Sequence, residues 1–375
     1  PRDSPEVLLA RQRWLAVRVQ PRGEEIVHPK PVIWSDGLRR PADLRCRNGL
    51  VGTVGHEAKK RTPYKGTSSK AILHQYDFLG DFYRLTLGPE LVFSYGMWEE
   101  GDTLDSAQVR KLDHHAEAAR AVGADRVLDI GCGYGSLLRR LVETHHVAHA
   151  VGITMSPAQA AWARDQHWPG CEVRVENWFD HEPGGPYDAI IAIEVIEHCA
   201  GNTMWRTQRV ARYREFFRRC HSWLRPAGRL SVQANAWNAR GWLASLVLPP
   251  QQLAPDRSGG TRAGLGLKDI LGGVKNVREG LHASRKVYPE CFLPTRDELN
   301  EASRGLFGIV EERSDPDDGV ATVRSWLEKA EANRVRGAEL IGESAVSDII
   351  REQKTALRFL REGRFTVVRM VFEKL

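Results

Sequence analysis

The sequence predicts an α/β fold with a mostly parallel sheet that helices cover on both faces. Between residues 126 and 231, strand-like apolar runs alternate with segments of helical periodicity, which is the pattern of repeated βαβ units. A glycine loop at residues 129–135 joins the first run to a helix. The 375 residues are 42% apolar and 27% charged, so we expect a soluble globular chain with a sizeable core and exclude disorder.

The predicted elements follow one another in a regular order. Strands are expected at residues 127–130, 150–153, 172–175, 189–193, 229–232 and 365–372. Helices are expected at residues 136–143 and 156–166, directly after residue 194, and at residues 213–224, 322–340 and 345–362. We place the last strand at the edge of the sheet.

The net charge of +6 is distributed unevenly. Residues 1–70 hold 15 Lys or Arg against 7 Asp or Glu, whereas the remaining chain is close to neutral. Because residues 1–70 show no sustained periodicity, we interpret them as a basic arm or small appendage before a domain at 71–375. A Gly-rich, basic stretch within residues 241–286 is interpreted as a lid outside the sheet.

Membrane and metal signals are weak. The longest apolar run, around residues 242–250, is far shorter than the roughly 20 residues of a bilayer-spanning helix. We therefore expect no transmembrane segment, while the basic arm leaves peripheral contact with a membrane surface open. The six cysteines form no Cys-x-x-Cys pair and have no histidines at zinc-finger spacing, which indicates a reduced, cytoplasmic compartment and no metal.

The glycine loop is the first candidate binding feature. Glycines at 131, 133 and 135 let the backbone approach a ligand, and the following helix N-terminus presents unpaired N–H groups. Their spacing differs from the G-x-G-x-x-G of dinucleotide sites and fits S-adenosylmethionine better. Asp129 would then meet the ligand's ammonium group. The alternative is a tight turn that binds nothing.

Polar residues also follow the candidate strands at 150–153 and 189–193. Thr154 and Gln159 are placed to hydrogen-bond a ribose, while Ser156 with Pro157 fits a helix cap better. After the strand at 189–193 come Glu194, Glu197 and His198, at the edge where ligands of open α/β sheets lie. A carboxylate beside an imidazole can accept a proton released from a methylated product. The alternative role for Glu197 and His198 is hydrogen bonding at a helix terminus.

The chain resembles S-adenosylmethionine-dependent methyltransferases of the cyclopropane-fatty-acid-synthase-like group from about residue 71 onwards. The matching blocks are residues 75–77 with 82–83, 93–98, 104–112, 127–135, 152–159, 187–198, 224–228 and 287–294. The resemblance implies a Rossmann-like class I methyltransferase fold with a seven-stranded sheet, and S-adenosyl-L-methionine as cofactor.

The resemblance also implies roles for individual residues. Tyr76 and Ser94 would close over the cofactor, and Trp178 would flank its adenine. Gly131 and Gly133 would contact the methionine end, and Thr154 and Gln159 the ribose. Asp129 and Glu194 complete the predicted cofactor-binding set.

This sequence departs from the family at the positions that hold a bicarbonate ion in the cyclopropane-forming members. By resemblance, those enzymes use a Cys, a Glu, a His and a Tyr to hold the ion, which acts as the base. The Glu position is retained as Glu197, whereas the other three positions fall on Tyr95, Gln233 and Gly319. We therefore expect neither a bound bicarbonate nor cyclopropane formation.

These observations predict C-methylation of a lipid-like, isoprenoid or aromatic specialised metabolite. Glu197, with His198, is the expected base, and aromatic faces would stabilise a carbocation. The predicted catalytic residues are Glu197, His198 and Tyr95, and the predicted substrate pocket holds Trp98, Tyr134, Gln233 and Trp237. The apolar residues 242–248 would shape this pocket, and arginines of residues 257–285 would hold any anionic acceptor.

Four other functions compete with this prediction. A cyclopropane or methyl-branched fatty acid synthase is disfavoured by the changes at the three bicarbonate-holding positions. N-methylation of a small amine would use the same cofactor site and one carboxylate base. A nucleic-acid methyltransferase is suggested by the basic arm, but the arm lacks interleaved aromatic residues and no Asn-Pro-Pro-Tyr-type motif follows the fourth strand, so no nucleic acid is expected as partner. A non-catalytic cofactor-binding protein is disfavoured by the intact glycine loop and Glu197.

Overall fold

A computed structural model describes residues 66–238, 242–248, 253 and 267–375. Most of the predicted basic arm at 1–70 and part of the predicted lid at 241–286 lie outside these residues. Residues 66–70 are described and contact the domain that follows, since the backbone N–H of Thr67 donates to the carbonyl of His198 at 2.9 Å.

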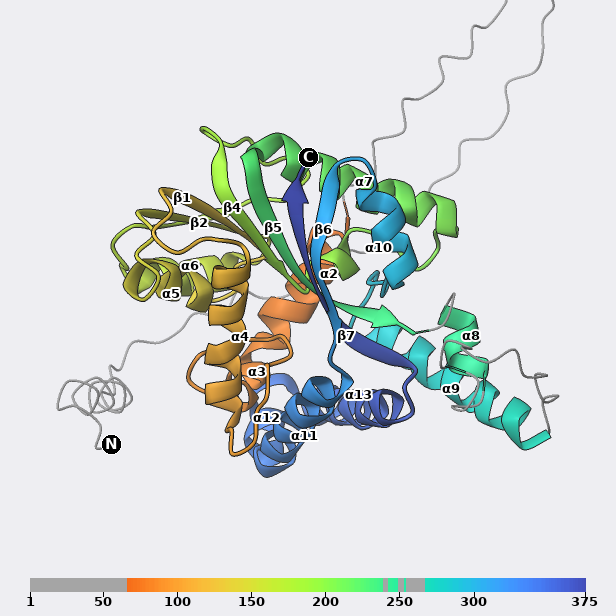
Figure 1. Cartoon of the computed structure of the whole chain (residues 1–375). Helices are drawn as coiled ribbons and strands as arrows, with labels where there is room; N and C mark the ends of the chain where they lie inside the picture. The colour runs from red at the N-terminus through yellow and green to blue at the C-terminus, as the bar shows by residue number, and fades with distance from the viewer. Residues whose placement is uncertain (1–65, 239–241, 249–252, 254–266) are drawn as a thin grey trace, which may run out of the picture. The chain divides into compact units, whose positions relative to one another are not determined.

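The centre of this domain is a seven-stranded sheet of order β3-β2-β1-β4-β5-β7-β6. Figure 1 shows β7 between β5 and β6. Its strands are β1 (Arg126–Ile130), β2 (His149–Thr154), β3 (Cys171–Val175), β4 (Tyr187–Ile193), β5 (Leu224–Trp237), β6 (Phe307–Ser314) and β7 (Phe365–Lys374). The first five strands are parallel, and β7 pairs antiparallel with both β5 and β6. The predicted mostly parallel α/β fold is confirmed.

The placement of the last strand at the sheet edge is wrong. β7 lies between β5 and β6, and β6 forms the edge. Residues 365–372 are all buried, as a mainly apolar interior strand should be, and they include Arg369. β6 escaped the sequence analysis because only Phe307 of its eight residues is buried and three of the others, Glu311, Glu312 and Arg313, are charged.

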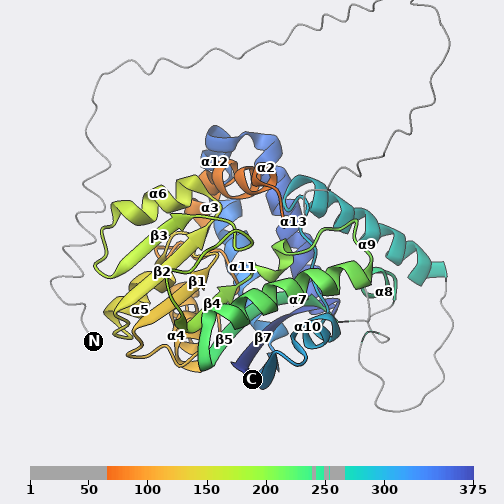
Figure 2. The ribbon, with the colours of Figure 1, turned by 90° about the horizontal axis from the view of Figure 1, so that it is seen from above.

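Helices cover both faces of the sheet. On one face, a buried cluster joins the sheet to α4 (Leu104–Ala118), α5 (Ser136–Glu143) and α6 (Pro157–Asp165). On the other face, α7 (Arg206–Trp223) and α10 (Arg296–Ser303) lie together over β4, β5 and β7, as Figure 2 shows. The polar residues after β1, β2 and β4 therefore emerge between two well-packed helical layers.

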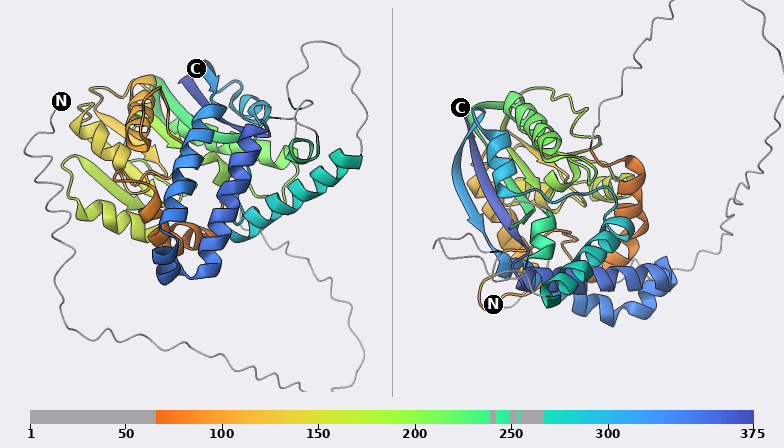
Figure 3. Two further views of the ribbon diagram at one scale, coloured as in Figure 1. Left: turned by 90° about the horizontal axis from the view of Figure 1, so that it is seen from below. Right: turned by 90° about the vertical axis from the view of Figure 1, so that its right-hand side faces the viewer.

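A third buried cluster lies at the carboxyl end of β5, where Trp237 pairs with Phe365 at the start of β7. Its helices are α3 (Gly80–Thr86), α11 (Pro316–Ala332), α12 (Arg334–Ile341) and α13 (Glu343–Arg361), and it is bordered by α2 (Ser69–Ile72) and a π-helical turn (Leu73–Phe78). Figure 3 shows α11 and α13 alongside each other. The single helix predicted at 322–340 is thus two helices that meet at Asn333, where the backbone leaves the helical conformation.

Two further helices come from the stretch predicted to be a lid. They are α8 (Trp242–Val247) and α9 (Leu267–Lys286), and neither belongs to the sheet. The helix predicted directly after residue 194 is only a single 3-10 turn (Ile196–His198). None of the described helices combines the length and the apolar content that crossing a bilayer would require.

Candidate active site

The glycine loop between β1 and α5 has left-handed backbone at each of its three glycines. The φ angles are +80° at Gly131, +54° at Gly133 and +82° at Gly135, in the region that side chains other than glycine rarely adopt. A Cβ on Gly131 would stand 2.4 Å from Cγ2 of Val195, whereas a Cβ on Gly133 would meet nothing within 4 Å. The loop is therefore tight on one side and open on the other.

The open side of the loop faces a cavity, which we call the cofactor cavity. All nine residues predicted to bind the cofactor line it, although they come from six separate parts of the chain. They are Tyr76, Ser94, Asp129, Gly131, Gly133, Thr154, Gln159, Trp178 and Glu194. Trp178 also belongs to the apolar core, with edge contacts to Phe179 and Phe216.

The polar groups after β2 are ordered around the start of α6. The Ser156 hydroxyl accepts the backbone N–H of Gln159 at 3.1 Å, which confirms the expected cap, with Pro157 at the first helical position. The Thr154 hydroxyl donates to Oε1 of Gln159 at 3.3 Å. The side chains of Thr154 and Gln159 are buried on the cavity wall, so their positions are fixed before any ligand binds.

Buried charges also line the cofactor cavity. Asp129 is 3% exposed, and burial raises its pKa to about 7. Lys111 of α4 is completely buried, donates to the Ser94 hydroxyl at 2.6 Å, and has its pKa lowered to about 7 by burial. The sequence analysis missed Lys111, although a lysine beside Leu112, in a segment where Ala107, Leu112 and Ala116 have helical spacing, was the available signal.

A second cavity of about 430 Å³, the acceptor cavity, adjoins the first. Four residues line both: Tyr76, Phe93, Glu194 and His198. Its wall includes four residues that were predicted to be catalytic or substrate-binding: Tyr95, Glu197, His198 and Trp237. Leu246, from the apolar stretch at 242–248, lies there as well. Its volume and its largely apolar wall, which includes several aromatic rings, suit a small organic ligand.

Glu197 lies on the 3-10 turn after β4 and is 5% exposed. Its Oε1 accepts the backbone N–H of Asn235 at 2.6 Å. Its Oε2 is buried and has no hydrogen-bond partner among the described residues. Burial, followed by the nearby Glu194 carboxylate, raises the pKa of Glu197 to about 8.

Glu194 occupies a left-handed backbone position with φ of +54°. Its Oε1 accepts the backbone N–H of Tyr95 at 2.8 Å and the side-chain amide of Gln233 at 2.9 Å. Burial raises its pKa, and these two hydrogen bonds oppose that rise. A strained backbone conformation persists only where the surrounding contacts hold it, and such positions are common at functional sites.

His198 is held by partners from other segments. Its Nε2 lies 2.9 Å from the Tyr76 hydroxyl, and its Nδ1 lies 3.2 Å from the Thr67 hydroxyl. Burial lowers its pKa to about 4, so the imidazole is neutral at neutral pH. The described contacts of Glu197 and His198 thus reach Asn235, Tyr76 and Thr67 rather than capping a helix.

Three residues predicted for the substrate pocket lie elsewhere. Tyr134 lines the cofactor cavity. The Trp98 indole donates to the Thr322 hydroxyl at 2.8 Å, away from the acceptor cavity wall. Gln233 is completely buried behind that wall, where its amide donates to the carbonyl of Tyr95 at 2.9 Å as well as to Glu194.

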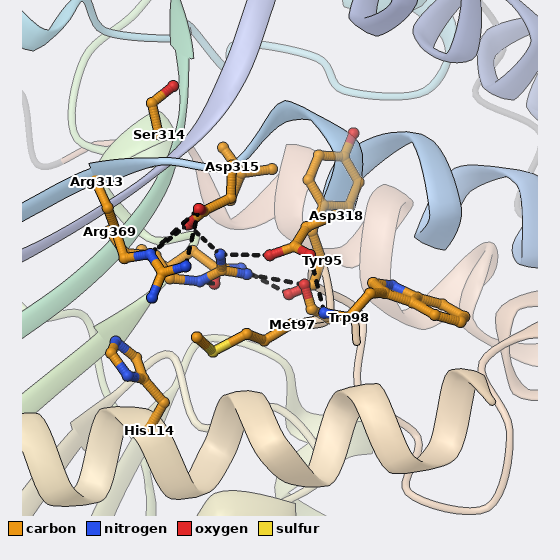
Figure 4. A network of polar contacts seen from close by, with 12 residues as sticks. Tyr95, Met97, Trp98, His114, Arg313, Ser314, Asp315, Asp318 and Arg369 are labelled. Atoms are coloured by element: carbon orange, nitrogen blue, oxygen red, sulfur yellow. Dashed lines mark hydrogen bonds and ion pairs between the residues drawn. The ribbon is translucent and has the colours of Figure 1, made fainter. Parts of the chain in front are cut away.

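A buried arginine organises the polar contacts behind this wall, as Figure 4 shows. Arg369 of β7 donates through Nε to Oε1 of Gln233 at 2.9 Å and through Nη2 to the carbonyl of Gly96 at 2.8 Å. Its Nη1 contacts the carboxylates of Asp315 and Asp318 at 2.5 and 2.6 Å. The segment that carries Tyr95 is thereby tied to the sheet.

The acceptor cavity also contains residues that the sequence analysis missed. Three of them line its wall: Tyr288, Trp326 from α11 and Glu352 from α13. Glu352 lies three residues after buried Ile349 and four before buried Ala356. A carboxylate on the apolar face of a predicted helix was therefore visible in the sequence, but nothing there showed which cavity it enters.

The fold and the two adjoining cavities define a class I S-adenosylmethionine-dependent methyltransferase. The chain matches the mycolic acid cyclopropane synthetase family over residues 64–352 and belongs to that family. The family uses S-adenosylmethionine, and the residues of the cofactor cavity, with an open glycine loop and a buried carboxyl, fit that ligand.

Individual relatives are similar over different parts of the chain. A probable fatty acid methyltransferase from Pseudomonas putida is 30% identical over 146 residues, which span 37% of this chain and only 37% of that relative. Cyclopropane mycolic acid synthase 3 from Mycobacterium tuberculosis is 25% identical over 326 residues, 84% of this chain and 98% of the relative. The solved cyclopropane synthase MmaA2 from the same organism has a TM-score of 0.69 at 23% identity, covering 82% of this chain and 99% of that one.

Proposed function

We propose that the protein methylates a carbon atom of a lipid-like, isoprenoid or aromatic acceptor without closing a cyclopropane ring, with Glu197 as the general base. The observation that carries this proposal is the unpartnered, buried Oε2 of Glu197 on the wall of an apolar cavity next to the cofactor cavity. Relatives described as a fatty acid methyltransferase and a cyclopropane mycolic acid synthase support a lipid-like acceptor.

The residues suit the charge changes of such a reaction. S-adenosylmethionine supplies an electrophilic methyl group, and an alkene or aromatic ring that accepts it becomes positively charged. The rings of Tyr95, Trp326 and Trp237 on the cavity wall stabilise that charge. Glu197 Oε2 then takes the proton from the acceptor. Tyr76 and Phe93 line both cavities, so they lie where the acceptor is positioned against the methyl group.

Three positions differ from the residues that hold bicarbonate in the cyclopropane-forming family members. The contacts at these positions support methylation without ring closure. The backbone N–H of Tyr95 and the amide of Gln233 both donate to Glu194, so a carboxylate of the chain already uses them. The third position, Gly319, lies in α11, where an added Cβ would stand 2.9 Å from the side chain of Leu360. There is no room at that position for a tyrosine.

Transfer from a deuterated methyl donor tests the proposal. The protein is incubated with S-adenosylmethionine carrying a CD3 group and three acceptors: vesicles of a monounsaturated phospholipid, an isoprenoid diphosphate and an aromatic amine. Methylation without ring closure leaves all three deuterium atoms in a new C-methyl group, because the proton removed comes from the acceptor. Cyclopropane formation would lose one deuterium from the transferred group, and that product would overturn the proposal.

N-methylation is the second candidate, because the buried ionisable groups of the acceptor cavity are mainly carboxyls. It predicts a CD3 group on nitrogen of the aromatic amine. Nuclear magnetic resonance separates the two outcomes, since N-methyl and C-methyl carbons differ in chemical shift. An N-methyl product without a C-methyl product would replace our first choice.

A further inference from the structure

Glu352 is a buried carboxyl group inside the acceptor cavity that the proposed chemistry does not use. It is 8% exposed, and together with Ala356 and Phe359 it lines the cavity from one face of α13. These three residues are spaced i, i+4 and i+7, as residues on one helix face are. The carboxyl therefore belongs to the cavity wall.

Few interactions within the protein compensate for the burial of the Glu352 carboxyl. Among the residues that the structure describes, its one hydrogen bond is a long one of 3.4 Å from the Tyr288 hydroxyl to Oε2. No Lys, Arg or His of the described residues forms an ion pair with Glu352, in contrast to buried Asp318, which contacts Arg369. Burying a carboxyl without a partner is unfavourable, so a neutral side chain would suit a purely structural role better.

The charges around the cavity favour a cationic partner over an anionic one. Its buried ionisable side chains include three carboxyls, those of Glu194, Glu197 and Glu352, and His198 is held neutral. Arg285 also lines the cavity, but it is exposed at the rim. The phenol of Tyr288 and the ring of Phe359 lie on the same wall, and aromatic faces attract ammonium groups.

We propose that Glu352 binds a protonated amine carried by the methyl acceptor. Glu352 lines the acceptor cavity and not the cofactor cavity, so this amine is held away from the shared wall, and another atom of the acceptor is methylated. The ammonium donates hydrogen bonds to the Glu352 carboxylate and contacts the rings of Tyr288 and Phe359. The acceptor is thus an amphiphile with an apolar or aromatic body and one amino group.

This inference rests on the proposed function in one respect, which is that the second cavity is the acceptor site. A binding experiment tests it without any methyl transfer. Full-length protein saturated with S-adenosylhomocysteine is titrated calorimetrically with 4-ethylbenzylamine, 4-ethylbenzyl alcohol and 4-ethyltoluene. We expect the amine to bind at least 10-fold more tightly than the other two probes. We expect Glu352→Gln to abolish that preference while binding S-adenosylhomocysteine as before.

Two further variants keep the test decisive. Tyr288→Phe removes only the hydroxyl that contacts Glu352, so we expect it to retain the preference for the amine. If Glu352→Gln unfolds, Tyr288→Phe takes its place as the cavity variant that is shown to fold. Glu339→Gln, on the exposed side of α12, should bind all three probes as the unmodified protein does. An amine that binds no more tightly than the alcohol, or a preference that survives in Glu352→Gln, would overturn the inference. Neither result would change the deuterium test of methyl transfer.

Discussion

At the scale of single residues, Glu197 decides whether the proposed proton transfer occurs. We expect Glu197→Gln to lower kcat by about 100- to 10,000-fold, the range typical of a lost general base, because an amide cannot take the proton. The dissociation constant for S-adenosylhomocysteine should not change, since Glu197 does not line the cofactor cavity. Kinetics with whichever acceptor takes up the CD3 group in the deuterium test measure kcat, and calorimetry measures the dissociation constant.

The pH dependence of the same enzyme checks this role independently. A base acts in its ionised form, and the pKa of Glu197 is raised to about 8, so the rate should increase with pH until about pH 8 and then level off. The exposed Glu182 gives a matched control, since Glu182→Gln should leave both the rate and its pH profile unchanged. A flat profile between pH 6 and 9 would argue against Glu197.

The glycine loop makes a second prediction about a single residue. Gly131→Ala should weaken binding of S-adenosylhomocysteine by at least about 10-fold, because the new Cβ would stand 2.4 Å from Val195 and the loop would have to move. Gly101 has a similar φ of +85° but nothing within 4 Å of its added Cβ, so Gly101→Ala isolates the backbone strain. Calorimetry should show normal ligand binding for Gly101→Ala, and equal losses in the two variants would contradict the steric argument.

At the scale of elements, Arg369 joins β7 to the segment that carries Tyr95. Arg369→Met would leave the carboxylates of Asp315 and Asp318 without this buried partner, so we expect a loss of about 3–5 kcal/mol in the free energy of unfolding. Arg313 also pairs with Asp315, but its side chain is 41% exposed, so Arg313→Met should cost less than about 1 kcal/mol. Urea denaturation compares the two variants, and similar losses would show that burial does not set the cost.

The elements also show how far the sequence could predict this protein. The glycine loop and the polar residues after β2 were found because short motifs next to apolar strands carry local signals, and all nine predicted cofactor residues line one cavity. Long-range placement was harder. β6 has only one buried residue, and the interior position of β7 depends on pairing with β5, in which Trp237 pairs with Phe365 and Arg229 with Glu373 across a long stretch of the chain.

The acceptor cavity was predicted less well for a related reason. Trp98 and Gln233 were assigned to it by their residue type and their place near the family positions, but Thr322 and Arg369 hold them behind its wall. Glu352 reaches the cavity only because α13 packs beside α11 at the end of the sheet. No local pattern specifies such packing between distant helices.

At the scale of the whole molecule, buried carboxyls make the stability of the fold depend on pH. The pKa of Glu352 is raised to about 8 by burial, whereas a Glu in an unfolded chain titrates near 4.3. Between these values the folded protein binds the extra proton. Its contribution to stability is therefore fully present below about pH 4.3 and is lost as pH rises through about 8.

A comparison with Glu352→Gln isolates this contribution, because an amide resembles the neutral carboxyl at every pH. We expect the variant and the unmodified protein to have similar free energies of unfolding at pH 5, and the variant to be more stable at pH 9, by on the order of 4 kcal/mol at most. Urea denaturation at both pH values measures the difference, and Glu339→Gln should show none. Adding 4-ethylbenzylamine at pH 9 should stabilise the unmodified protein more than the variant, because a bound ammonium supplies the partner that the ionised carboxylate lacks. A difference between the two proteins that does not vary with pH would mean that the Glu352 carboxyl is already solvated or paired.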